Sequence, residues 1–77
     1  MNIIIYGKGC ARCTALYETI AQLTADRPDI NISKETSLEA MMDKGIVSTP
    51  AVEMDGVIKC SGRIPGRDEL ALWINGK

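Results

Sequence analysis

The hydrophobic pattern of the first 35 residues predicts a strand, a helix and a second strand. Residues 2–6, NIIIY, form a continuous β-branched and aromatic run that is typical of a buried central strand. Spacings of three and four then predict one face of an amphipathic helix, which Pro28 ends. The positions on this face are Cys13, Leu16, Tyr17, Ile20, Leu23 and Thr24. Residues 30–35, INISKE, alternate isoleucine with polar residues, which predicts a strand nearer the sheet edge.

The next segment predicts a short helix over residues 38–44. Its apolar side is formed by Leu38, Met41 and Met42. Thr36 and Glu39 have the spacing of a capping box, in which each side chain bonds a free backbone N–H of the first turn. Gly45 suits the left-handed conformation that commonly ends a helix.

The remaining residues predict a hairpin and a final helix. Two short β-type runs flank Asp55-Gly56, and a type I′ turn needs positive φ at both central positions, which this dipeptide favours. Asp68 and Glu69 suit the positive first turn of a helix, whose apolar face is Leu70, Trp73 and Ile74. The predicted order is β-α-β-α-β-β-α in one domain over residues 1–77. We expect an α/β fold with a four-stranded mixed sheet flanked by helices, its first two strands parallel and its hairpin antiparallel.

Composition narrows the class of function. Nine basic and ten acidic residues leave a formal charge of −1, and the basic residues form no stripe, which argues against a nucleic-acid partner. The start of the chain has no features of a secretion signal, and no apolar run is long enough to span a bilayer. We therefore expect a cytoplasmic protein without a membrane partner. Histidine is absent, which removes the usual general base at neutral pH and the commonest metal ligand.

Two of the three cysteines stand three residues apart, where the first strand gives way to the first helix. At a helix start, Cys10 lies near unsatisfied backbone N–H groups and the positive end of the helix dipole, and both favour its thiolate. Cys13 falls on the buried face of the helix, more shielded but within reach of a disulfide. We predict thiol–disulfide exchange in which Cys10 attacks and Cys13 resolves, with local positive charge from Lys8 and Arg12. Two thiols suffice, so we expect no cofactor.

Two other interpretations of the cysteine pair stay open. The cysteines could simply be small core residues. They could also bind metal, although a zinc site would find only Cys60 and carboxylates as further ligands. Soft thiolates bind Cu(I) without histidine, as in the small heavy-metal-binding domains of copper chaperones, which also carry a C-x-x-C loop. Those domains continue with strand, strand, helix and strand after the first helix, an order that differs from the one predicted here. We therefore favour the redox interpretation and predict no metal ligands.

The cysteine loop, the order of elements and the stretch STPA (48–51) together resemble the thioredoxin fold, most closely the short glutaredoxin-like redox-active disulfide proteins. The stretch SGRIPG (61–66) resembles a Ser-Gly-Arg-x-Pro stretch of that small family. The resemblance implies a cis peptide bond before Pro50, facing the cysteine pair. It also implies that Thr49 and Pro50 form an edge on which the extended chain of a substrate docks. The implied activity is that of a protein-disulfide oxidoreductase, and the implied substrates are disulfide-containing proteins.

The sequence also departs from the better-known members of the superfamily. The dipeptide between the cysteines is Ala11-Arg12, neither the Gly-Pro of thioredoxin nor the Pro-Tyr of glutaredoxin, so the redox potential is not assigned. The first strand lacks thioredoxin's carboxylate, and we expect its Tyr6 to serve in packing. For glutathione, Lys8 and Thr49 match two of the family's contacts, whereas only Gly62 and Arg63 stand near the third. The electron donor is either a thioredoxin reductase-like system or glutathione, and we expect a monomer.

The third cysteine, Cys60, lies in the run VIKCSG. Alternation places Ile58 and Cys60 on one face, and a two-residue turn would pair Cys60 with Ala51, next to Pro50. We expect Cys60 to pack in the core as a small apolar residue, with an auxiliary redox or metal role as the alternative.

Overall fold

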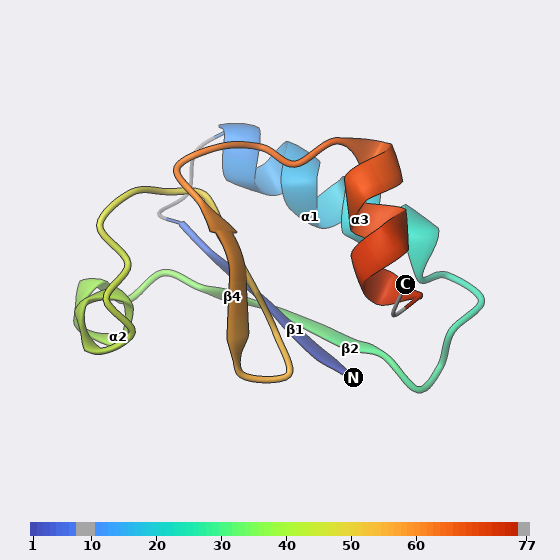
Figure 1. Cartoon of the computed structure of the whole chain (residues 1–77), viewed down its shortest axis with the longest axis horizontal. Coiled ribbons are helices and arrows are strands. Elements are labelled where there is room, and N and C mark those ends of the chain that lie inside the picture. Colours follow the sequence, from blue (N-terminus) through green and yellow to red (C-terminus); the bar gives the residue numbers. More distant parts are fainter. Residues whose placement is uncertain (8–10, 76–77) are drawn as a thin grey trace.

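The computed structural model describes residues 1–7 and 11–75, in which four strands form one mixed sheet (Figure 1). The elements are β1 (Asn2–Tyr6), α1 (Ala11–Leu23), β2 (Asn31–Glu35), α2 (Leu38–Asp43), β3 (Ala51–Met54), β4 (Val57–Ser61) and α3 (Arg67–Ile74). This is the predicted order. Neither α1 nor any other helix of the described residues is long and apolar enough to cross a membrane.

The strand order is β2-β1-β3-β4, which makes β1 a central strand and β2 an edge strand, as their sequences predict. β1 runs parallel to β2 and antiparallel to β3, and β3 and β4 form the antiparallel hairpin. The turn between them has φ values of 50° at Asp55 and 85° at Gly56, the signs that a type I′ turn requires. The Asp55 carboxylate accepts a 2.8 Å hydrogen bond from the Asn2 backbone N–H, so the hairpin tip is attached to the start of β1.

Helices cover both faces of the sheet, as expected, but unequally (Figure 1). α1 and α3 lie over one face and enclose the larger core. Its buried residues are Ile3, Ile5, Leu16, Ile20, Ile30, Val52, Met54, Cys60, Leu70 and Ile74. The other face carries a smaller cluster of Tyr6, Met41, Ile46 and Ala51 beside α2. Because burying one large aliphatic side chain stabilises a fold by about 1.5–3 kcal/mol, the α1/α3 face supplies most of the hydrophobic stabilisation.

The pairing of β3 with β4 differs from simple alternation. Val52 pairs with Cys60, and the register shifts between this pair and the next one toward the turn. Lys59 is therefore an extra residue that forms a β-bulge. The expected pairing of Cys60 with Ala51 is wrong. Because the bulge reverses the alternation, Ile58 and Cys60 lie on opposite faces, and Ile58 does not belong to the α1/α3 core.

The N-terminal cap of α2 also differs from the prediction. Its cap is Ser37, whose hydroxyl accepts a 3.3 Å hydrogen bond from the backbone N–H of Ala40. The expected capping box on Thr36 is therefore wrong by one residue. Thr36 and Ser37 both carry a hydroxyl that can cap a helix, so residue type does not distinguish them. Gly45, which follows the C-cap residue Lys44, has a φ of 74°, as predicted for the C-terminal end of the helix.

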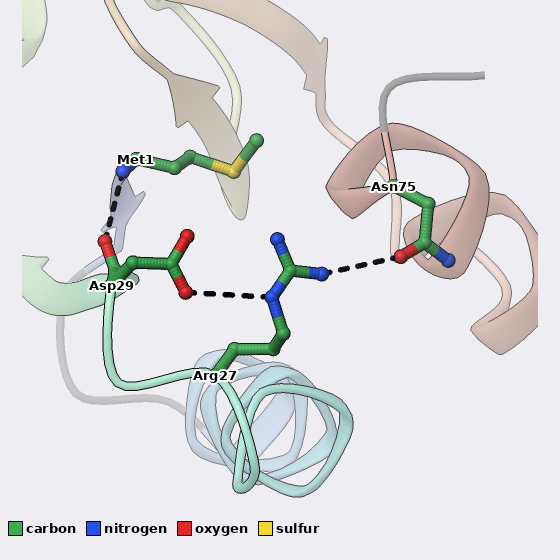
Figure 2. A network of polar contacts seen from close by, with 4 residues as sticks. All are labelled: Met1, Arg27, Asp29 and Asn75. Carbon is green, nitrogen blue, oxygen red and sulfur yellow. Dashed lines mark hydrogen bonds and ion pairs between the residues drawn. The ribbon is translucent and has the colours of Figure 1, made fainter.

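A polar network joins three segments where β1 begins (Figure 2). The ammonium group of Met1 donates to the backbone carbonyl of Asp29 at 3.0 Å. The Arg27 guanidinium lies 3.4 Å from the Asp29 carboxylate and donates to the side-chain carbonyl of Asn75 at 3.3 Å. These contacts are exposed and individually weak, and they link the start of the chain, the α1–β2 loop and the end of α3.

Candidate active site

The predicted redox residues are only partly within the described residues. Cys10 and Lys8 lie outside them. Helix α1 begins at Ala11, so Cys13 is the third residue of the helix and Arg12 the second. The Cys13 side chain is 3% exposed, and Arg12 is exposed to solvent. The predicted burial of Cys13 on the inner face of the helix is thus present in the fold.

The Cys13 sulfur lies against Gly7, the residue that follows β1. A Cβ atom added to Gly7 would overlap the Cys13 Sγ and would lie 3.2 Å from the Cys13 Cβ. The same added atom would lie 4.0 Å from the Cβ of Thr49. The end of β1, the first turn of α1 and the segment before β3 therefore meet at Gly7. Nothing in the sequence pattern singles out Gly7, because the contact depends on how closely the first turn of α1 approaches the end of β1.

The peptide bond between Thr49 and Pro50 is cis, as the resemblance implies. Pro50 is fully buried, whereas Thr49 is exposed immediately before it. Ala51 then begins β3 and pairs with Tyr6 on β1, which fixes this segment beside the central strand. The structure thus places an exposed Thr49 next to the Gly7–Cys13 contact.

Gly62 holds the segment after β4 against the segment that carries Thr49. Its φ is 80°, and its backbone N–H donates to the carbonyl of Pro50 at 3.0 Å. A Cβ atom on Gly62 would lie 2.9 Å from the Cβ of Ser48, closer than real Cβ atoms come. Through Gly62, the SGRIPG stretch therefore packs closely against the Ser-Thr-Pro stretch.

Replacing Gly62 with alanine is expected to destabilise the protein by about 1–3 kcal/mol, because it adds left-handed backbone strain and a clash with Ser48. Urea unfolding measures this change. The matched control is Gly66→Ala, because a Cβ at Gly66 meets no atom within 4 Å and its φ is −70°. Equal free energies of unfolding for the two variants would contradict the prediction.

A buried carboxylate that the sequence analysis missed lies on the α2 face of the sheet. Glu53 is 5% exposed and accepts a 2.8 Å hydrogen bond from the Tyr6 hydroxyl. Lys44, at the end of α2, lies 3.6 Å from the same carboxylate oxygen. Burial, the hydrogen bond to Glu53, and the charges of Glu53 and Glu35 together raise the pKa of Tyr6 to about 12. The signal available in the sequence was a single glutamate inside the otherwise apolar run AVEM (51–54).

Cys60 packs in the α1/α3 core and is 9% exposed. Its burial raises the pKa of the thiol, an effect that the nearby charge of Arg63 partly offsets. A raised pKa keeps Cys60 in the unreactive thiol form at neutral pH, which accords with the expected packing role. In residues 1–7 and 11–75, no three Cys, Asp or Glu side chains are grouped so as to hold a metal ion.

Comparison with known proteins decides the family. A family model described as a thioredoxin domain matches residues 1–75. The chain belongs to the thioredoxin family. A thioredoxin of Methanothermobacter thermautotrophicus is 28% identical over 71 residues, which cover 91% of this chain and 92% of that protein. A thioredoxin of Methanocaldococcus jannaschii is 32% identical over 80 residues, covering 97% of this chain and 92% of that protein.

Membership of the thioredoxin family gives this chain a role of the thiol–disulfide oxidoreductase type. The order of elements after the first helix distinguishes the redox interpretation from the copper-chaperone interpretation, and it agrees with this assignment. Helix α2 precedes the β3–β4 hairpin and α3 follows it, whereas a copper-chaperone domain would have a different order. The fold is that of a thioredoxin domain.

Proposed function

We propose that the protein exchanges electrons with disulfide-containing proteins through Cys10 and Cys13. The observation that carries this proposal is the position of the Cys13 sulfur, which is buried in the first turn of α1 against Gly7, a residue that also lies near Thr49. Cys10 immediately precedes the first residue of α1, a sequence position where backbone N–H groups and the helix dipole favour a thiolate. In this proposal Cys10 is the nucleophile and Cys13 the resolving thiol.

The reaction is a pair of thiol–disulfide exchanges. The Cys10 thiolate attacks one sulfur of the substrate disulfide, forms a mixed disulfide and releases the other substrate sulfur as a thiolate. Cys13 then loses its proton to solvent and attacks the Cys10 sulfur, which releases the second substrate thiolate. The substrate disulfide gains two electrons, and the protein dithiol becomes the Cys10–Cys13 disulfide. A dithiol reductase or glutathione returns the two electrons to the protein.

The cis segment supplies the docking edge in this proposal. Thr49 is exposed and precedes the buried Pro50, so the Thr49 backbone is the group that an extended substrate chain would pair with. Lys8 and Arg12 contribute positive charge near the cysteines, which favours the thiolate. The two thiols carry out the whole exchange, so the proposal includes neither a metal nor an organic cofactor, and a single chain contains every group it uses.

The pH dependence of alkylation tests the proposed nucleophile. In the reduced, metal-free protein, Cys10 should react with iodoacetamide with an apparent pKa well below the free-thiol value of about 8.5, because only the thiolate attacks. Peptide mapping by mass spectrometry separates the three cysteines. Cys60 is the internal control, and it should react only at higher pH because burial raises its pKa. If Cys10 and Cys13 titrate alike near 8.5, the redox assignment is contradicted, and Cu(I) titration is then the experiment that tests the alternative.

A further inference from the structure

Gly7 leaves a space that the sulfur of Cys13 fills. Gly7 is buried directly after β1, and a Cβ atom there would overlap the Cys13 Sγ. Only the Cys13 Sγ would overlap the added atom. Of the other near atoms, the Cys13 Cβ would lie at a tight 3.2 Å and the Thr49 Cβ at an ordinary 4.0 Å. The missing side chain at Gly7 therefore leaves the room in which the sulfur lies.

The strand side of this contact is fixed. The Gly7 backbone N–H donates to the carbonyl of Glu35 at 3.0 Å, so Gly7 continues the pairing of β1 with β2. The preceding residue, Tyr6, is 2% exposed and its hydroxyl donates to the buried Glu53 at 2.8 Å. Because β1 is held between β2 and β3, the backbone of Gly7 cannot retreat without breaking these bonds.

The helix side of the contact is easier to move. Cys13 is the third residue of α1, and the backbone N–H groups of the first helical turn have no acceptors within the helix. Helix ends also open at lower free energy than central strands. A methyl group at Gly7 would therefore displace the Cys13 sulfur and the first turn of α1, while the end of β1 stays in place.

We infer that Gly7 is a positioning residue for the resolving step: its bare backbone lets the Cys13 sulfur sit where it can close the disulfide with Cys10. This inference rests on the proposed function of the Cys10–Cys13 pair. Gly7 neither contacts the substrate nor forms a bond in the exchange, and it acts through the position of the Cys13 sulfur. A larger residue at this position leaves both thiols present but disfavours the bond between them.

The redox equilibrium of Gly7→Ala tests the inference. In glutathione buffers, the equilibrium constant for forming the Cys10–Cys13 disulfide should fall about tenfold, which equals a shift of about +30 mV in reduction potential. The matched control is Gly66→Ala, since Gly66 is exposed and a Cβ there meets no atom within 4 Å. This control should keep the wild-type potential. A Gly7→Ala equilibrium constant within about twofold of the wild-type value overturns the inference.

A double-mutant cycle on stability identifies the clashing atom. Gly7→Ala should lower the folding equilibrium constant about tenfold or more in the wild type and in Cys13→Ser, which keeps an atom at the sulfur position. In Cys13→Ala the loss should shrink to about threefold or less, because the overlapping atom is gone. If Gly7→Ala alone fails to fold, recovery of folding in Gly7→Ala/Cys13→Ala supports the inference. An equal loss in all backgrounds overturns it.

The two measurements separate this inference from the proposed function. If the wild-type protein forms no Cys10–Cys13 disulfide in glutathione buffers, the proposed function fails and the positioning role fails with it, even where the stability cycle shows the steric contact. If the wild type forms the disulfide and Gly7→Ala keeps the wild-type potential, only the role of Gly7 is rejected.

Discussion

Replacing Cys10 with serine is expected to abolish disulfide exchange, with a loss on the order of a thousandfold or more, because a serine hydroxyl is not ionised at neutral pH and forms no disulfide. Replacing Cys13 with serine should have a different result. The Cys10 thiolate still attacks, but no second thiol resolves the product. Intact mass spectrometry of Cys13→Ser after reaction with a disulfide-bonded protein should therefore detect a stable mixed disulfide with the substrate.

The third cysteine provides the control for these two variants. Cys60→Ala removes a thiol that is buried in the α1/α3 core and should keep the rate of exchange within about twofold of the wild type. The insulin reduction assay measures all three variants under the same conditions. Turnover retained in Cys10→Ser, or lost in Cys60→Ala while the protein stays folded, would contradict the roles assigned to the cysteines.

Between pH 10 and 12 the free energy of unfolding should fall by about 2 kcal/mol through Tyr6 alone. The unfolded chain ionises this phenol near pH 10, whereas burial and then the hydrogen bond to Glu53 raise its pKa to about 12 in the folded protein. Above pH 10 the unfolded chain releases the proton first, so stability decreases as pH rises toward 12. Below pH 10 the contribution is fully present.

Tyr6→Phe tests this dependence. The variant should be less stable at pH 8 by about 1–3 kcal/mol, because the buried Glu53 loses a hydrogen-bond donor. Its stability should then fall less steeply between pH 10 and 12 than that of the wild type, as urea unfolding at several pH values measures. In the control Tyr17→Phe, which keeps the Tyr6–Glu53 bond, the steep fall should persist. Parallel pH profiles of wild type and Tyr6→Phe would refute the assignment.

Local patterns were sufficient to predict the order of the elements. The run NIIIY, the helical spacing after Cys13 and the Asp55-Gly56 turn each depend on neighbouring residues, and the structure contains all three features. The cis bond before Pro50 came from the resemblance, because a sequence alone favours trans for any proline. The predicted residues Cys10 and Lys8 lie outside the described residues, so their placement stays a prediction.

The features that sequence reasoning missed depend on how closely elements approach one another in space. The bulge at Lys59 arises within a hairpin whose turn was predicted correctly, so it could not be inferred from the turn. Glu53 is acceptable in a buried strand only because Tyr6 and Lys44 reach it from β1 and α2. The contact of Gly7 with Cys13 depends on how closely α1 approaches the end of β1. Periodicity carries no information about any of these distances.

The bulge at Lys59 also affects how the molecule meets its own copies. A sheet with open outer strands offers unpaired backbone groups to another chain, and in the order β2-β1-β3-β4 the outer strands are β2 and β4. On β4 the bulge interrupts the regular spacing of these groups and places a lysine at the irregularity, which discourages edge-to-edge polymerisation. On β2 the exposed Ser33 and Lys34 serve the same purpose. The bulge that shifts the register of the hairpin thus also protects the β4 edge against pairing with a strand of another copy.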